Sequence, residues 1–222
     1  MHKMVNSYGM VHNSRYWSEI ESSISKYGAS KEDVTIMDLG CGPGLLLRDL
    51  LHRYHPQRVI GVDLSEVMLE HAEIELEEEL LELENSGAIE TDGVEIKLIQ
   101  QHLQHDPHLP TGVDYIFSSR VLRSFEDQHQ SFDSMYKALN PGGLLVLLDW
   151  TRASIPTYDQ WFRSSESHFS DLTAWDVVAY HRNFSRYDLE DWEYILNAAG
   201  LEVVHRFQLS PVYSCIIGKK PL

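Results

Sequence analysis

A buried strand that runs directly into a glycine-rich turn and a helix constrains this chain more than any other feature. Residues 34–39 read Val-Thr-Ile-Met-Asp-Leu, and residues 40–44 read Gly-Cys-Gly-Pro-Gly. A turn that reverses the chain in so few residues needs positive φ and close backbone approach, which glycine tolerates. The leucine-rich segment 45–51 then predicts a helix whose first N–H groups lack intrahelical partners. The pattern therefore predicts a nucleotide-type binding loop.

Strands and helices alternate along much of the remaining chain. We expect strands at 34–39, 58–62, 94–99, 113–118 and 144–149, and helices at 15–26, 45–54, 65–84, 127–139 and 188–199. Continuous apolar runs such as 144–148 favour strands covered on both faces, as in a parallel sheet flanked by helices. The last two predicted strands, 201–209 and 212–218, are separated only by Ser210-Pro211, so they must run antiparallel. The predicted fold is α/β: a doubly wound, mostly parallel seven-stranded sheet with an antiparallel C-terminal hairpin.

The charge, the cysteine content and the apolar segments of the chain limit which partners and which cellular location are expected. The chain has 18 Lys+Arg against 34 Asp+Glu, a net charge of −16, which argues against nucleic-acid or anionic-membrane partners. Nine glutamates lie between Glu66 and Glu84, and we interpret them as a solvated helix face. Cys41 and Cys215 are far apart, which disfavours a disulfide framework or zinc site and favours a reducing compartment. With no signal peptide core or membrane-spanning run, we expect a cytoplasmic protein without a metal and without membrane insertion.

The expected domain organisation is a single binding domain with two additions. Residues 1–33 are polar and aromatic and are expected to form an N-terminal helical lid segment. Residues 34–222 are expected to form the binding domain itself. Within it, residues 150–186 interrupt the alternation and are rich in Ser, Trp, His and Tyr, so we interpret them as a lid or insertion.

Two families of α/β domain could contain the glycine turn. A dinucleotide-binding fold has Gly-x-Gly-x-x-Gly with an acid about 20 residues further on. Here Gly40, Gly42 and Gly44 give Gly-x-Gly-x-Gly, and Leu45 stands where the dinucleotide pattern has glycine. Asp63 ends the second strand and suits ribose hydroxyls in either family. A dinucleotide oxidoreductase is therefore disfavoured but stays an alternative.

Four features in order resemble the class I S-adenosylmethionine-dependent methyltransferases. They are Asp38–Gly44, the segment Gly-Val-Asp-Leu-Ser at 61–65, the segment Leu-Asn-Pro-Gly-Gly at 139–143, and the closing hairpin. The resemblance covers roughly residues 34–218 and is greatest to the small-molecule branch that includes ubiquinone/menaquinone-type methyltransferases. It implies a Rossmann-like fold, S-adenosylmethionine as cofactor with S-adenosylhomocysteine as product, and a small-molecule methyl acceptor. A cofactor-binding protein of this fold without methyl transfer is a second alternative.

The resemblance also implies which residues hold the cofactor. Asp38 would hold the ammonium group, Asp63 would accept both ribose hydroxyls, and Met68 would form an apolar wall of the adenine pocket. The acid that relatives often carry after the third strand is missing, so Gln101 or His102 is expected to substitute, with Leu103 packing on the adenine ring. The full expected set is Asp38, Gly40, Cys41, Gly42, Gly44, Asp63, Leu64, Met68, Gln101, His102, Leu103, Ser119 and Arg120.

The acceptor side is less defined by the sequence. Methyl transfer mainly requires alignment and exclusion of water, and a base only if the acceptor is neutral. No catalytic residue is assigned; Asp149, His168 and His181 are candidates because they lie at the cleft rim or in 150–186.

Residues near the expected acceptor side allow more than one interpretation. Arg123 and Ser124 replace histidines frequent in relatives, and Arg123 would either orient an acidic substrate or form a surface ion pair. Aromatic residues of the insertion either pack the lid or line an aromatic, apolar acceptor site; they are Trp161, Phe162, Phe169, Trp175 and Tyr180. We expect a monomer or homodimer.

Overall fold

One mixed sheet forms the centre of the protein in the computed structural model, which describes residues 8–28, 33–87, 93–102, 105–106, 108–122, 125, 127–164 and 172–222. Within these residues the sheet has seven strands in the order β3-β2-β1-β4-β5-β7-β6. The strands are β1 (Thr35–Leu39), β2 (Arg58–Asp63), β3 (Glu95–Gln100), β4 (Val113–Ser119), β5 (Leu139–Trp150), β6 (Glu202–Ser210) and β7 (Tyr213–Lys219). Neighbours among β1–β5 are parallel, whereas β7 is antiparallel to both β5 and β6. The predicted fold is confirmed.

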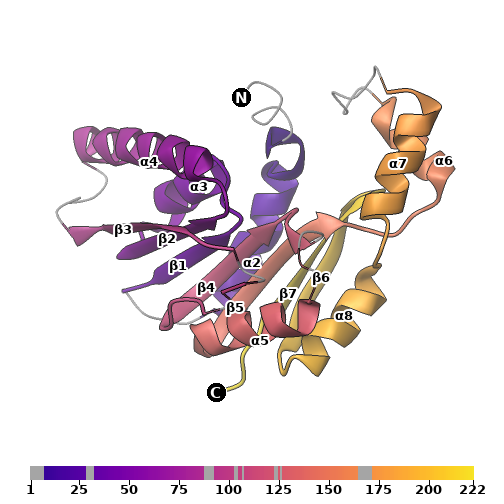
Figure 1. Ribbon diagram of the computed structural model, residues 1–222. Coiled ribbons are helices and arrows are strands. Elements are labelled where there is room, and N and C mark those ends of the chain that lie inside the picture. Colours follow the sequence, from indigo (N-terminus) through magenta and orange to yellow (C-terminus); the bar gives the residue numbers. More distant parts are fainter. Residues whose placement is uncertain are drawn as a thin grey trace.

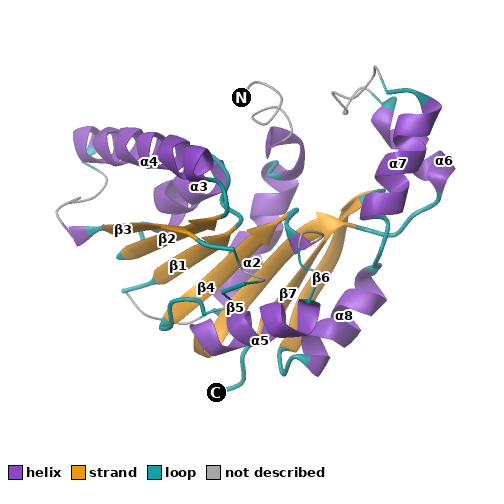
Figure 2. Ribbon diagram, in the orientation of Figure 1, coloured by secondary structure: helices purple, strands orange, loops and turns teal. Residues whose placement is uncertain are grey.

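Helices cover both faces of this sheet (Figures 1 and 2). One face carries α2 (Ser14–Tyr27), α3 (Leu45–Tyr54) and α4 (Glu66–Ser86), and the other carries α5 (Gln128–Ala138) and α8 (Leu189–Ala198). Two more helices, α6 (Ile155–Phe162) and α7 (Ala174–Phe184), stand beyond the carboxyl end of β5, at the upper right of Figure 1. Among the described helices, none combines the length and the apolar character that a membrane crossing needs.

The apolar run in β5 shows why a two-sided sheet forms. Leu144, Val146 and Leu148 pack into the cluster that contains residues of α2 and α3. Leu145 and Leu147, which alternate with them, pack into the cluster on the face of α5 and α8. Because side chains of a strand alternate between faces, a continuous apolar run is stable only when both faces are covered. Each such leucine contributes about 2 kcal/mol by burial.

The start of β5 differs from the prediction. The strand begins at Leu139 rather than at Leu144, because Asn140 is fixed in the sheet by a side-chain contact. Its Nδ2 donates to Asp114 Oδ1 at 2.8 Å, and Asp114 Oδ2 accepts the Thr35 N–H at 2.9 Å. These contacts tie β1, β4 and β5 together at their amino ends. The Asn-Pro-Gly-Gly segment therefore lies at the opposite end of the sheet from the glycine turn.

The described part of segment 150–186 contains α6 and α7, and aromatic rings pack these helices against the sheet. Trp150 lies 5.8 Å from Tyr158, 5.0 Å from Phe184 and 4.3 Å from Tyr213 between ring centroids. Trp161 and Phe162 are buried in the same cluster, and Tyr180 packs against it. Trp175, in contrast, is 80% exposed, and Phe169 lies outside the described residues.

Candidate functional site

The glycine turn follows β1 and is pressed against its neighbours. Gly40, Gly42 and Gly44 have φ of +74°, +52° and +84°. A Cβ on Gly40 would lie 2.3 Å from a Val121 methyl carbon, and one on Gly44 would lie 2.8 Å from the Ala72 Cα. Positive φ disfavours larger residues at all three positions, and close approach excludes them at Gly40 and Gly44, whereas a Cβ on Gly42 would meet no atom within 4 Å. The turn is therefore a rigid strand-to-helix connection whose backbone is open on one side.

Asp63 fixes this turn to the end of β2. Its Oδ2 accepts the Gly42 N–H at 2.8 Å, and its Oδ1 accepts the Ser65 N–H at 2.9 Å. Ser65 is also the N-cap of α4, because its Oγ accepts the Met68 N–H. A carboxylate oxygen has two lone-pair sites, so each oxygen of Asp63 can still accept one more hydrogen bond.

A cavity of about 120 Å³ opens beside the turn, between the carboxyl ends of β1 and β4. This is where the strand order reverses, the position at which open α/β sheets bind their ligands. Described residues from the turn, α3, the end of β4 and the N-terminal segment line it: Tyr8, His12, Asp38, Gly40, Cys41, Gly42, Pro43, Leu45, Leu46, Ser119 and Arg120.

Asp38 lies at the bottom of this arrangement with an unsatisfied carboxyl oxygen. The residue is 2% exposed, and its Oδ1 has no hydrogen-bond partner among the described residues. Burial raises the pKa of this carboxyl to about 8, and the charge of Asp63 adds to the effect. Buried polar groups are normally satisfied, so an orphan carboxyl oxygen at a cavity indicates a ligand that carries a donor or a cation.

His12 is a second buried polar group at the cavity, and the sequence analysis missed it. It is 6% exposed, and its Nδ1 lies 3.2 Å from the Tyr8 carbonyl oxygen. If Nδ1–H donates there, Nε2 carries the lone pair, and Nε2 is buried without a partner in the described part of the chain. Burial lowers the pKa of His12 to about 3, with Arg120 adding to the effect, so the ring is neutral. The available signal was the spacing of four residues in Tyr8, His12 and Tyr16.

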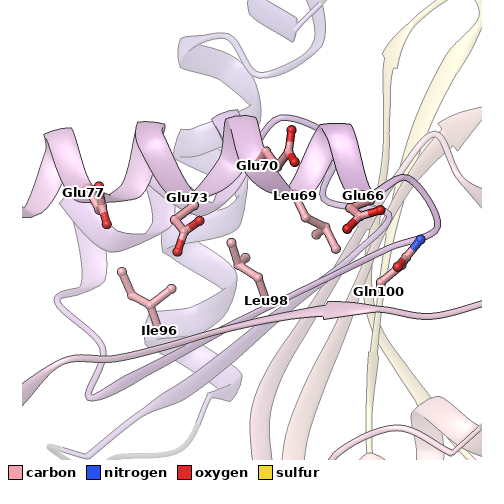
Figure 3. Close-up of a pocket in the computed structure, with 8 residues that line it drawn as sticks. All are labelled: Glu66, Leu69, Glu70, Glu73, Glu77, Ile96, Leu98 and Gln100. Atoms are coloured by element: carbon pink, nitrogen blue, oxygen red, sulfur yellow. The ribbon is translucent and has the colours of Figure 1, made fainter.

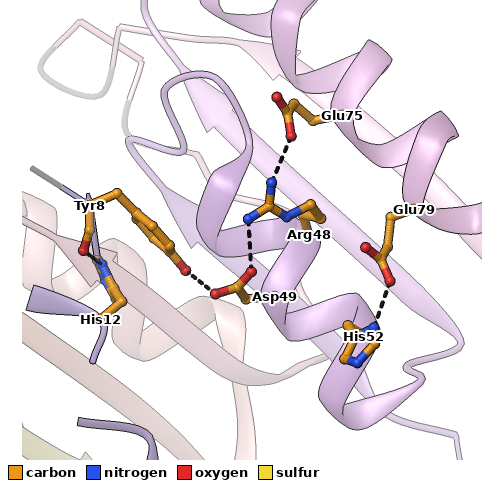
Figure 4. A network of polar contacts seen from close by, with 7 residues as sticks. All are labelled: Tyr8, His12, Arg48, Asp49, His52, Glu75 and Glu79. Atoms are coloured by element: carbon orange, nitrogen blue, oxygen red, sulfur yellow. Dashed lines mark hydrogen bonds and ion pairs between the residues drawn. The ribbon is translucent and has the colours of Figure 1, made fainter. Parts of the chain in front are cut away.

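A polar network holds the N-terminal segment against the cavity (Figure 4). The Tyr8 hydroxyl donates to Asp49 Oδ2 at 2.6 Å. Arg48 connects Asp49, at 3.2 Å, to Glu75 of α4, at 3.0 Å. The Tyr8 ring stacks on His12 with 4.1 Å between centroids. These contacts fix the helical turn over residues 8–11 onto α3, so that Tyr8 and His12 close one side of the cavity.

The end of β4 supplies the opposite wall. Ser119 Oγ is buried and has no hydrogen-bond partner among the described residues. Arg120 has φ of +62°, which is uncommon for a residue with a Cβ, and its N–H donates to the Leu148 carbonyl at 2.7 Å. Strained backbone of this kind concentrates at functional sites. Cys41 is also buried in the wall, and burial raises the pKa of its thiol.

The residues predicted for an adenine pocket lie after β2 and β3. Leu64 is 58% exposed, and Met68 is half-buried in the first turn of α4. The Gln101 N–H donates to the Asp63 carbonyl at 2.9 Å, and its Nε2 donates to the carbonyls of Asp106 and His108. His102 stacks on His105 with 4.1 Å between ring centroids. Leu103 lies outside the described residues, so of the three residues expected after β3 the structure describes Gln101 and His102.

The candidate catalytic residues have other surroundings. The Asp149 carboxylate accepts the Trp150 N–H at 2.7 Å and the Leu122 N–H at 3.0 Å. His181 Nε2 lies 2.9 Å from the Ala153 carbonyl oxygen. Neither is among the described residues that line the cavity. His168, Arg123 and Ser124 lie outside the described residues, which contain no group of three or more His, Cys, Asp or Glu side chains able to hold a metal ion.

Comparison with known proteins places the chain in a family. A protein-family model described as a methyltransferase domain matches residues 11–206. Demethylmenaquinone methyltransferase of Lactococcus lactis is 29% identical over 130 residues, which are 58% of this chain and 47% of that protein. Trans-aconitate 2-methyltransferase of an Azoarcus species is 31% identical over 114 residues, 51% of this chain and 38% of that protein. The chain thus spans about half or less of the length of these relatives.

Solved structures agree in fold. An S-adenosylmethionine-dependent methyltransferase from Mesorhizobium loti superposes with a TM-score of 0.62 and 20% identity, over 96% of this chain and all (100%) of that one. The fold and the glycine turn define a Rossmann-like α/β protein with a cavity at the β1–β4 reversal. Since the family model matches most of the sequence, the chain belongs to the methyltransferase domain family.

Proposed function

We propose that this protein is an S-adenosylmethionine-dependent methyltransferase that transfers the methyl group to a small-molecule acceptor. The observation that carries the proposal is the cavity at the β1–β4 reversal, where the buried Asp38 carboxyl faces space without a partner among the described residues. This cofactor carries an ammonium group and a sulfonium centre, and the ammonium group could donate the hydrogen bond that Asp38 Oδ1 lacks. Leu45 replaces the third glycine of the dinucleotide-binding pattern, which disfavours a pyrophosphate ligand.

The polar groups of the cavity suit the amino-acid end of the cofactor. Asp38 Oδ1 and His12 Nε2 would both accept from the ammonium group. Ser119 Oγ and the Arg120 guanidinium would face the carboxylate. The glycine turn, from Gly40 through Cys41 and Gly42 to Gly44, would lie along the methionine and ribose parts, since its backbone allows close approach.

The ribose and adenine would lie beyond the turn. Asp63 would accept the two ribose hydroxyls through its remaining lone pairs. Leu64 and Met68 would border the adenine, and Gln101 or His102 would take the place of the acid that relatives carry, with Leu103 against the ring. This assignment rests on the order of these residues after β2 and β3.

The role proposed for the chain in methyl transfer is to align the acceptor with the methyl group. S-adenosylmethionine supplies an activated methyl group with a good leaving group, so the protein must hold the acceptor in line and keep water out. His12, with a pKa of about 3, is a weak base in this cavity. We therefore propose an acceptor that is already nucleophilic or loses its proton easily.

The acceptor is proposed to be an aromatic or apolar small molecule bound under a lid. The Lactococcus relative is named a demethylmenaquinone methyltransferase, and an acceptor of that kind would be apolar. The closing of one cavity wall by Tyr8 and His12 supports a lid role for residues 1–33, and residues 150–186 are proposed as its counterpart. Cys41 and Cys215 are free and buried, which is compatible with the proposed cytoplasmic location. A monomer or homodimer is proposed.

A transfer assay tests the proposal. The protein is incubated with methyl-labelled S-adenosylmethionine and fractionated metabolite extract, and labelled product and S-adenosylhomocysteine are measured together. Asp63→Ala serves as the site variant, and Asp133→Ala, an exposed acid paired with Lys137, serves as the matched control. We expect transfer by the wild type and the control but not by the site variant. Cofactor binding without transfer to any fraction would support the non-methylating alternative.

A further inference from the structure

Helix α4 carries two apolar rows on opposite sides. Leu69, Leu76 and Leu83 are buried in the cluster against α3 and β2. Val67, Ile74 and Leu81 form a second row and are 56%, 53% and 58% exposed. Each row repeats every seven residues, and the rows are offset by two residues, about 200° around a helix. A surface helix needs one apolar face for its own fold, so the outer row is not explained by packing within the described chain.

The same outer face is strongly acidic. The helix has nine glutamates and neither Lys nor Arg. Glu75 and Glu79 turn toward α3, where they pair with Arg48 at 3.0 Å and His52 at 2.8 Å (Figure 4). Four more glutamates form a row along the helix: Glu66, Glu70, Glu73 and Glu77. Within the described residues the structure gives no ion pair for this acidic row. Like charges at this spacing repel one another, so the acid row destabilises the isolated helix.

A groove continues this surface toward the sheet edge (Figure 3). It has a volume of about 470 Å³ and lies between α4 and the edge strand β3. Leu69, Ile96 and Leu98 form its apolar floor, and the row from Glu66 to Glu77 forms its rim. The acidic row therefore runs between the exposed apolar row and an open apolar groove.

We propose that the outer face of α4, made of Val67, Ile74 and Leu81 with the acidic row beside them, is a docking surface for an amphipathic helix of a partner protein. The partner helix would repeat its apolar residues every seven positions and carry Lys or Arg on the flank that meets the glutamates. The seven-residue repeat of the exposed row matches such a helix, and the charge is complementary to it.

Other occupants fit this surface poorly. A second copy of the chain would place two acidic rows against each other, and like-charge contact is unfavourable. An anionic lipid surface or a nucleic acid would be repelled by the same glutamates. A small polycation would satisfy the acids but leave the apolar row exposed. A basic amphipathic helix satisfies both rows at once.

The test uses a fluorescent synthetic peptide as long as α4, with leucines at heptad positions and lysines on the flanks. Fluorescence anisotropy measures its binding to the full protein at low and high salt. We expect saturable binding that weakens with salt, and at least tenfold weaker binding to the Ile74→Ser/Leu81→Ser variant and to Glu73→Lys/Glu77→Lys. Tyr194→Ser removes an exposed apolar side chain on α8 and should leave binding unchanged.

Three results would overturn the proposal. They are absence of saturable binding, equal affinity of the wild type and the Ile74→Ser/Leu81→Ser variant, and equal loss in the Tyr194→Ser control. Sedimentation of each protein is measured alongside, and a dimer that dissociates in the Ile74→Ser/Leu81→Ser variant would assign the face to a second copy instead. Circular dichroism verifies folding of each variant. Because peptide binding is measured without cofactor, its result is independent of the proposed methyl transfer.

Discussion

Replacing Asp38 by Asn should abolish a loss of stability that the wild type undergoes as the pH rises, and should weaken the proposed cofactor site. The folded carboxyl has a pKa of about 8, whereas its ordinary value is 3.8. Between these values the folded state keeps a proton that the unfolded state has lost, so the free energy of unfolding falls as pH rises. With about 1.4 kcal/mol for each pH unit, the cost at pH 7 is on the order of 4 kcal/mol and is fully developed above about pH 8.

The Asn variant lacks this titration. Its buried amide N–H groups cost about 1–3 kcal/mol at every pH, so the pH dependence, rather than the absolute stability, carries the test. The free energy of unfolding is measured in urea at intervals between about pH 4 and pH 8. Over this range the difference between variant and wild type should shift by several kcal/mol in favour of the variant. Asp133→Asn, at an exposed acid, is the control and should run parallel to the wild type. Parallel profiles for Asp38→Asn and the wild type would show that the pKa of Asp38 is not raised in the folded protein.

Further predictions concern the walls of the cavity. His12→Phe should weaken S-adenosylhomocysteine binding about tenfold by calorimetry, the loss of one buried hydrogen bond, whereas His12→Gln should retain part of the affinity because it keeps an acceptor. The same His12→Phe variant should lose less stability than the wild type as pH falls from about 6.5 toward 3, since the folded state resists protonation of His12; equal acid profiles would contradict this. Tyr8→Phe removes the hydroxyl that donates to Asp49 and should lower the free energy of unfolding in urea by about 1 kcal/mol, with the ring stack retained. Gly44→Ala forces a Cβ onto Ala72 at φ +84° and should lower stability by about 1–3 kcal/mol; an unchanged melting temperature would show that the turn is not strained there.

The parts of the fold and site that the sequence predicted depend on local signals. The strand, the glycine turn and the next helix follow one another within residues 34–54. Their order alone therefore places Asp38 and the turn at the carboxyl end of the strand. The position of Asp63 followed in the same way from the end of the second strand. The antiparallel finish followed from the short Ser210-Pro211 link, which leaves no room for a crossover.

The parts that the sequence did not predict depend on contacts between distant residues. His12 reaches the cavity because Tyr8 bonds to Asp49, 41 residues further along the chain, and no local pattern announces that contact. Strand β5 begins early, at Leu139, because the Asn140 side chain donates to Asp114 on the neighbouring strand β4. Asp149 lies next to the end of β5, one residue before Trp150, yet its carboxylate accepts hydrogen bonds from two backbone N–H groups. Burial and hydrogen-bond partners, which decide such roles, are properties of the folded chain.

Calorimetric titration with S-adenosylhomocysteine tests the central claim most directly. We expect saturable binding to the wild type and to Asp133→Ala, and a strong loss of affinity in Asp63→Ala, whose carboxylate fixes the glycine turn and is proposed to accept the ribose hydroxyls. Circular dichroism and the melting temperature of each variant establish that it is folded. Absence of binding to the wild type would contradict the proposed sulfonium cofactor, and unchanged affinity in folded Asp63→Ala would contradict the proposed ribose site at Asp63.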